Sequence, residues 1–242
     1  MDQSRITDLT GVGGRQIAGV RWQPGKHASD RLAVCLPGLS YPSEGPLTFY
    51  MKLAFVAAGW DWWSIDYRYL EDDAFTRLDW PQRNRYLREE AVAIGEYVKR
   101  TANHRQIVLV GKSLGTIMVD TLMHAETFRT GGPRMGYVIL TPTDVQGSIL
   151  DSLAESGEPA LLVIGDRDRF FDRDLARQAA AMANIRQLVI PGAGHILEQV
   201  PDATGDKAAP AGSIPESIRN LVPAVELLEK ALTDRFFDQE GA

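Results

Sequence analysis

A glycine-flanked serine is the first feature of the sequence that could do chemistry. Residues 111–115 read Gly-Lys-Ser-Leu-Gly, a G-x-S-x-G pattern with Ser113 at its centre. An apolar run at 106–110 precedes it and a helical pattern at 114–124 follows, which predicts a sharp strand-to-helix turn. Glycines suit such a turn because strand and helix approach closely there. The turn would lift the serine hydroxyl above the sheet, beside the first N–H groups of the helix, where it can act as a nucleophile.

The same residues admit other interpretations. The serine could simply cap the helix after a tight turn. Gly111-Lys112-Ser113 also matches the end of a phosphate-binding loop, but Gln106 stands where that loop needs its first glycine, and 107–110 has the pattern of a strand interior. The early glycines at 11–14 do not make a dinucleotide motif, because Gln16 occupies its last glycine position. We therefore exclude nucleotide hydrolysis through 106–113 and expect no cofactor.

A serine nucleophile needs a base, and the base needs a carboxylate that orients it. Of the four histidines, His195 lies in a glycine-rich loop directly after the last predicted strand. That loop belongs to the same carboxyl edge of the sheet as the serine, where doubly wound folds place their sites. Asp166 and Asp168 follow another apolar strand at this edge, and both remain candidates for the acid. Asp172 is expected to cap the next helix.

Short apolar runs alternate with longer helical patterns along the chain, which indicates an α/β fold with a mostly parallel sheet. A hairpin around the glycines at 11–14 opens the chain. Further strands are expected at 31–38, 61–69, 106–110, 135–142, 159–166 and 186–192, and helices at 46–58, 78–102, 114–124, about 145–155, 172–183 and 214–233. Pro223 should kink the last helix or mark its start.

The order Ser113, Asp168, His195 is the chain order of nucleophile, acid and base in the α/β-hydrolase superfamily. The sequence resembles a small serine hydrolase of that superfamily from the hairpin to the final helix. The resemblance implies an eight-stranded, mostly parallel sheet with helices on both faces and an N-terminal antiparallel hairpin. It maps the family's acid onto Asp168. Only one short helix fits between Pro142 and Pro159, so we expect no full cap domain.

The family pattern also implies an oxyanion hole made by the backbone N–H groups of Leu39 and Leu114. The family's His-Gly-x loop corresponds to Pro37-Gly38-Leu39 here, so its histidine is absent. This matters little, because the hole uses backbone groups. Candidates for the substrate pocket are the residues that follow this loop and those that follow the acid: Ser40, Tyr41, Phe170 and Phe171.

Composition limits the other possibilities. The 242 residues are 44% hydrophobic and 24% charged, which is typical of a globular protein and compatible with a single α/β-hydrolase domain over 1–242. A net charge of −6 argues against nucleic-acid or anionic-membrane binding. Cys35 is the only cysteine, which excludes an intramolecular disulfide and a Cys-based zinc site. We expect a cytoplasmic protein without a metal or a membrane span.

These observations lead us to expect a serine hydrolase that cleaves small-molecule carboxylic esters or thioesters through an acyl-enzyme. A peptidase or an acyltransferase could use the same three residues, and a non-catalytic binding protein could keep the fold. A dehalogenase is disfavoured, because that branch of the superfamily needs an aspartate where Ser113 stands. The sequence leaves open the acyl chain, the leaving group, the oligomeric state and whether the linker-like stretch 201–215 folds over the site.

Overall fold

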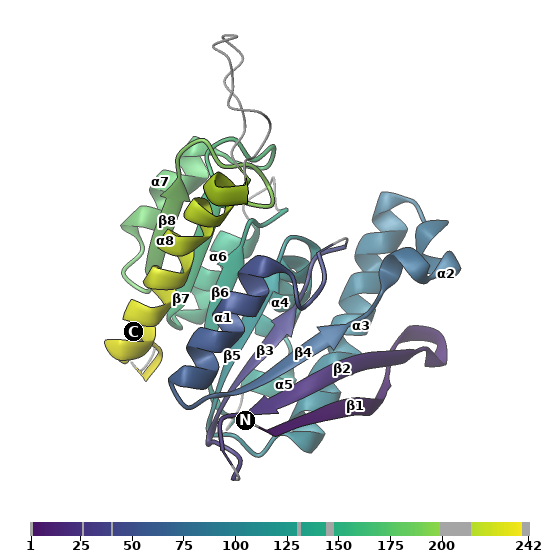
Figure 1. Cartoon of the computed structure of the whole chain (residues 1–242). Helices are drawn as coiled ribbons and strands as arrows, with labels where there is room; N and C mark the ends of the chain where they lie inside the picture. The colour runs from purple at the N-terminus through teal and green to yellow at the C-terminus, as the bar shows by residue number, and fades with distance from the viewer. Residues whose placement is uncertain are drawn as a thin grey trace.

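The fold is built on one eight-stranded sheet (Figure 1). The computed structural model describes residues 2–25, 27–39, 41–129, 132–143, 148–198 and 214–238. The strand order is β1-β2-β4-β3-β5-β6-β7-β8, and every pair is parallel except β1–β2 and β2–β4. The strands are β1 (Asp2–Thr10), β2 (Gln16–Gln23), β3 (Arg31–Leu36), β4 (Asp61–Asp66), β5 (Gln106–Lys112), β6 (Arg134–Leu140), β7 (Ala160–Gly165) and β8 (Ile185–Ile190).

Helices cover both faces of this sheet. They are α1 (Pro46–Ala57), α2 (Asp73–Thr76), α3 (Trp80–Thr101), α4 (Leu114–Met123), α5 (Glu126–Arg129), α6 (Ser148–Ser156), α7 (Arg173–Ala181) and α8 (Ile214–Thr233), with 3-10 turns η1 (Val12–Gly14), η2 (Tyr69–Glu71) and η3 (Phe236–Asp238). Buried side chains of α1 and α8 pack with Cys35 and Val110 on one face, and those of α3, α4 and α6 pack with Val34 and Leu109 on the other. Successive strand residues point to opposite faces, and the runs 32–36 in β3 and 107–110 in β5 are apolar because they are buried on both faces.

The predicted elements agree with the observed ones within a few residues, with two exceptions. The strand expected at 61–69 ends at Asp66, because the chain turns away at Arg68, which has a φ of 45°. The suggestion that Pro223 marks the start of the last helix was wrong, since α8 begins at Ile214 and runs through it. Leu221 and Leu228 are buried on either side of this proline, and their burial offsets the lost helical hydrogen bond.

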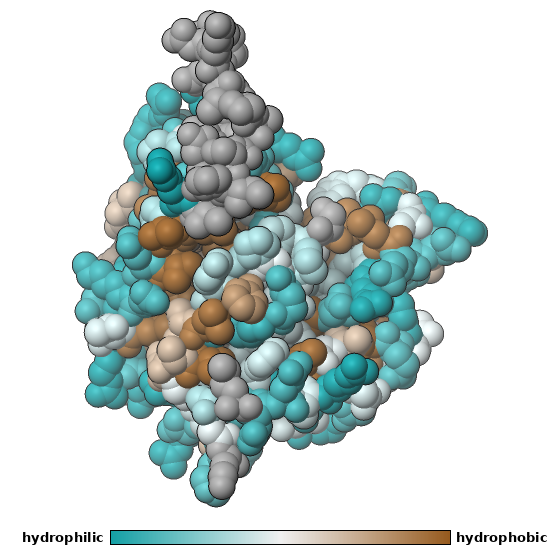
Figure 2. Space-filling model, in the orientation of Figure 1, coloured by the Kyte–Doolittle hydropathy of each residue, from teal (hydrophilic) through white to brown (hydrophobic). Residues whose placement is uncertain are grey.

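The expected absence of a full cap domain between β6 and β7 is confirmed, since the helix described there is the nine-residue α6. A different feature overhangs the sheet: η2, α2 and the beginning of α3 form an arm that projects beyond it (Figure 1). Figure 2 shows hydrophobic residues between the hydrophilic ones on this arm, and the side chains of Leu70 and Trp80 are more than half exposed. No helix within the described ranges is long and apolar enough to span a bilayer.

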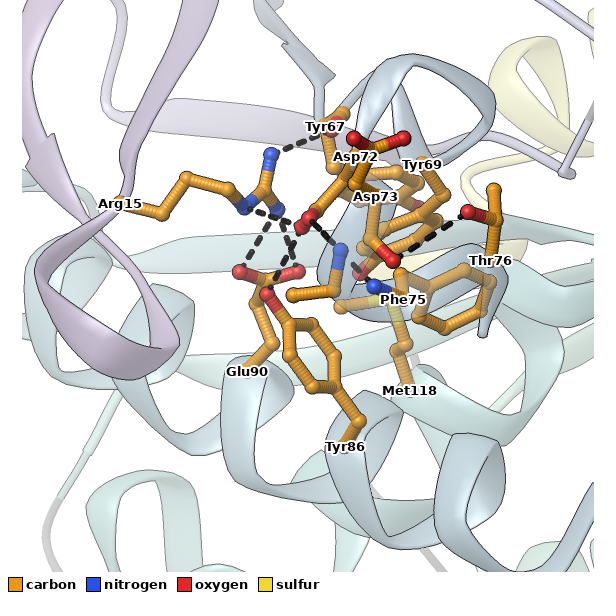
Figure 3. A network of polar contacts seen from close by, with 11 residues as sticks. Arg15, Tyr67, Tyr69, Asp72, Asp73, Phe75, Thr76, Tyr86, Glu90 and Met118 are labelled. Carbon is orange, nitrogen blue, oxygen red and sulfur yellow. Dashed lines mark hydrogen bonds and ion pairs between the residues drawn. The ribbon is translucent and has the colours of Figure 1, made fainter. Parts of the chain in front are cut away.

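A buried ion pair fixes the arm to the hairpin. The guanidinium of Arg15 donates 2.8 Å hydrogen bonds to both carboxylate oxygens of Glu90 on α3, whose side chain is fully buried. Arg15 also lies 3.3 Å from the carboxylate of Asp72 and donates to the backbone carbonyl of Tyr67 (Figure 3). Asp72 in turn caps α2 and accepts a hydrogen bond from Tyr86. One arginine thus connects the hairpin, the arm and α3.

Candidate active site

Ser113 occupies the sharp turn that the sequence predicts. β5 ends at Lys112 and α4 begins at Leu114, so Ser113 alone makes the turn, with φ 53° and ψ −119°. Such angles are strained for a residue with a side chain and are held only where the surroundings enforce them. The flanking glycines make this possible: a Cβ at Gly115 would lie 1.9 Å from the carbonyl oxygen of Leu36, and one at Gly111 would lie 2.7 Å from a methyl carbon of Val119.

A continuous chain of hydrogen bonds joins the three residues that the sequence singled out. Oγ of Ser113 lies 2.8 Å from Nε2 of His195, and Nδ1 of His195 lies 2.7 Å from Oδ2 of Asp168. The side chain of Asp168 is fully buried, and its other oxygen accepts a 3.0 Å bond from the N–H of Phe170. Because an ionised carboxylate only accepts, Nδ1 must donate to it, which leaves Nε2 free to accept the Ser113 proton.

The two candidate acids lie in different surroundings. Asp168 contacts His195, whereas the exposed Asp166 accepts a 2.7 Å hydrogen bond from the N–H of Gly192. Asp166 therefore supports the loop that carries the histidine, and the geometry fits Asp168 as its orienting partner. Asp172 accepts from the N–H groups of Asp174 and Leu175 and caps α7, as expected.

The loop after β3 runs directly beside the serine. A Cβ on Gly38 would lie 3.1 Å from the Cβ of Ser113, a tight contact that a glycine avoids. The hydroxyl of Tyr67 donates a 2.9 Å bond to the carbonyl of Pro37 and holds the loop in place. Leu39 and Leu114, the residues expected to supply the oxyanion hole, both line the pocket in front of the serine.

Lys112 is a functional residue candidate that the sequence analysis missed. Its side chain is 1% exposed, and its ammonium donates to the hydroxyl of Thr141 at 3.1 Å and to the carbonyl of His195 at 3.2 Å. The ammonium also lies 4.6 Å from the centre of the Tyr41 ring. Burial lowers the pKa of Lys112 to about 8, against the opposing effect of the nearby Asp168 and Glu198 carboxylates. Residue type and position alone gave no sign of these contacts.

We call the cavity in front of the serine the Ser113 pocket; it measures about 640 Å³. Of the four expected pocket residues, Tyr41 and Phe170 line it, and the ring of Phe170 meets the His195 imidazole edge to face at 5.3 Å. Phe171 lines a neighbouring, smaller cavity instead, and Ser40 falls outside the described residues. The lining residues that sequence analysis missed are Trp80, Arg83, Thr143, Arg169 and Ile196.

Two of the missed residues had a signal in the helical pattern. Trp80 stands three residues before Arg83, and Arg83 stands four before Leu87, so both continue the helix face whose C-terminal part is buried on the sheet. α3 extends beyond the sheet (Figure 1), so the N-terminal part of this face lines the pocket instead. Within the described part of the chain, no group of three or more His, Cys, Asp or Glu side chains is placed to hold a metal ion.

Comparisons with known proteins show the family to which the chain belongs. The model of an alpha/beta hydrolase domain family matches residues 39–212, well over half of the chain. No curated protein matched in a sequence search. Among solved structures, Est1E from Butyrivibrio proteoclasticus aligns with a TM-score of 0.65 at 13% identity, covering 94% of this chain and 98% of that one.

Two further structures show the same fold. A putative alpha/beta hydrolase from Agrobacterium tumefaciens aligns with a TM-score of 0.64 at 15% identity, covering 99% of this chain and 100% of that one. A cold-adapted esterase from an Arctic intertidal metagenomic library aligns with a TM-score of 0.59 at 16% identity, covering 94% and 93%. With the family match and the strand order described above, the chain belongs to the alpha/beta-hydrolase family.

Proposed function

We propose that this protein is a serine hydrolase that cleaves carboxylic esters or thioesters. The observation that carries the proposal is the hydrogen-bonded chain from Asp168 through His195 to Ser113, which opens onto the Ser113 pocket. A serine held beside a neutral imidazole that a buried carboxylate orients is the arrangement that activates a hydroxyl for acyl transfer. The names of similarly folded esterases support the choice of esters.

In the proposed reaction, Nε2 of His195 takes the Ser113 proton as Oγ attacks the carbonyl carbon of the substrate. The N–H groups of Leu39 and Leu114 donate to the oxygen that becomes negatively charged. Collapse of this intermediate breaks the bond to the alcohol or thiol, which leaves with the proton from His195. Water then attacks the acyl-enzyme with the same base, releasing the acid and restoring Ser113. Asp168 stabilises the imidazolium that forms in each half.

The test is hydrolysis of 4-nitrophenyl esters and acyl thioesters of several chain lengths by the wild type, Ser113→Ala and a control, Ser4→Ala. Ser4 lies exposed on β1 and does not line the pocket. We expect Ser113→Ala to lose roughly 10⁴-fold or more in kcat while keeping its unfolding temperature, and the control to retain full activity. Chelator should leave the wild-type rate unchanged.

Three outcomes would contradict the proposal. The first is an unchanged rate in Ser113→Ala. The second is a wild type that cleaves no ester or thioester but cleaves peptide amides, which would make it a peptidase. The third is a wild type that transfers the acyl group only to an added alcohol or amine and not to water, which would make it an acyltransferase.

A further inference from the structure

The Ser113 pocket is positively charged in a protein that is negative as a whole. The chain carries 32 acidic and 26 basic residues. Among the described residues that line the pocket, none is acidic and three are cationic: Arg83, Lys112 and Arg169. The side chains that line the pocket therefore carry the opposite sign to the protein, and the Asp168 and Glu198 carboxylates near Lys112 offset only that one cation. A concave site of one sign concentrates ligands of the other sign.

Arg83 is held in place but forms no ion pair with any residue that the structure describes. One terminal nitrogen donates a 2.6 Å bond to the carbonyl of Thr76, and the guanidinium carbon lies 5.4 Å from the centre of the Phe75 ring. Its Nε is buried and has no hydrogen-bond partner among the described residues, and no described carboxylate forms an ion pair with it. Arg83 is thus an oriented guanidinium with N–H groups that have no partner among the described residues, which suits binding of a carboxylate or phosphate oxyanion.

Arg169 adds a second cation, beside the base. It follows Asp168 in the chain, and its guanidinium carbon lies 4.6 Å from the centre of the Phe170 ring, which itself contacts His195. The ion pairs found between described residues do not include Arg169. Lys112 differs from both arginines, because its ammonium is engaged by Thr141 and the His195 carbonyl.

The remaining walls of the pocket are largely apolar. Trp80 and Ile196 line it with side chains that are 52% and 53% exposed, and Leu39 and Phe170 lie deeper. Binding is favoured when an apolar part of a ligand covers these exposed apolar side chains and removes them from water. The pocket therefore offers an apolar surface together with two guanidinium groups that lack an acidic partner in the described structure.

From this arrangement we infer that the substrate is an ester or thioester with an apolar segment and a second, anionic group, a carboxylate or a phosphate, which Arg83 and Arg169 bind. The inference rests on the proposed hydrolysis at Ser113 and adds its substrate class. The anion can sit in the acyl part or in the leaving group, because the pocket surrounds the serine. The experiment below separates these two cases.

The first arm compares mono(4-nitrophenyl) adipate with neutral 4-nitrophenyl hexanoate, which have acyl chains of equal length. The second compares the butanoyl thioesters of 4′-phosphopantetheine and of pantetheine, which differ only in a phosphate on the leaving group. We expect the wild type to prefer the anionic member of at least one pair roughly 10- to 100-fold in kcat/KM, the usual range for a hydrogen bond to a charged group. The preference should fall as salt is raised.

The variants Arg83→Gln and Arg169→Gln should each reduce the ratio of kcat/KM between the anionic and the neutral substrate, mainly by raising the KM of the anionic one. The double variant should bring this ratio close to one. Arg85→Gln is the matched control, because Arg85 is exposed on the same helix and does not line the pocket; it should leave the ratio unchanged. A second readout avoids turnover: adipate should slow fluorophosphonate labelling of Ser113 in the wild type and not in the double variant.

Equal rates on both members of both pairs would overturn the inference and leave the proposed hydrolysis standing. The same holds if the two arginine variants keep the wild-type ratio. Failure to cleave any of the four substrates, charged or neutral, would instead count against the hydrolysis itself, and the labelling experiment would then decide the anion site alone.

Discussion

The ammonium group of Lys112 donates a 3.2 Å hydrogen bond to the backbone carbonyl of His195. The residue that precedes the nucleophile is therefore bonded directly to the loop that carries the base. The same ammonium reaches the hydroxyl of Thr141 at the end of β6. Three segments at the carboxyl edge of the sheet thus meet at one buried cation, which fixes the distance between Ser113 and His195.

The buried Lys112 predicts an unusual dependence of stability on pH. In the folded protein burial lowers its pKa to about 8, against 10.5 for an ordinary lysine. Below pH 8 the Lys112 ammonium is charged in both the folded and the unfolded protein, and the folded state carries the full cost of burying that charge. Between pH 8 and 10.5 the unfolded chain binds more protons, so this contribution to stability rises with pH, by about 3 kcal/mol in all.

The check is urea unfolding of the wild type and Lys112→Met at intervals from pH 7 to 10.5. The other titrating groups are common to both proteins and cancel in the difference between their free energies of unfolding. We expect this difference to move in favour of the wild type above pH 8. Two parallel curves would show that Lys112 titrates at its ordinary pKa.

A second prediction separates the neighbouring aspartates. Asp168→Asn removes the carboxylate that orients His195 and should lower kcat by roughly 10⁴-fold. Asp166→Asn weakens only a hydrogen bond to the N–H of Gly192 and should cost less than about 10-fold. Steady-state kinetics of both variants on one ester decides the matter. A larger loss in Asp166→Asn would mean that Asp166, and not Asp168, is the acid.

The third prediction concerns the ion pair that anchors the arm. Arg15→Met leaves the fully buried Glu90 without its partner and should cost about 3–5 kcal/mol in the free energy of unfolding. Replacing both residues, with Arg15→Met and Glu90→Leu together, should recover most of this loss, because the fully buried carboxylate is then gone and Asp72 keeps its hydrogen bonds from Tyr86 and the N–H groups of α2. Arg5→Met, at an exposed position on β1, is the control. Equal stability of the single and double variants would show that Glu90 is not held by Arg15.

The positions of Ser113 and His195 could be predicted because their signals are local: a strand, a glycine turn and a helix for one, and a glycine loop after a strand for the other. The choice between Asp166 and Asp168 needed the resemblance to a family. Both aspartates follow the same strand, and only the course of the loop decides which of them faces His195. The resemblance likewise supplied the number of strands, whereas their order in the sheet was not predicted, because local periodicity does not show which strands pair.

Other contacts could not be predicted because they join distant parts of the chain. Arg15 and Glu90 are 75 residues apart, and nothing in either segment identifies its partner. Lys112 and the His195 carbonyl are 83 residues apart. The helical pattern puts Arg83 on the same helix face as Leu87, but it does not reveal how far α3 extends past the sheet, and that decides whether Arg83 lines the pocket. These features are set by tertiary packing.

Whether Ser113 is the nucleophile can be measured by mass spectrometry of the protein after treatment with a fluorophosphonate. If His195 activates Ser113, the wild type should gain a single adduct, located on the peptide that contains Ser113, and Ser113→Ala should gain none. An adduct on a different residue, or full labelling of Ser113→Ala, would contradict the account, because the nucleophile would then lie elsewhere.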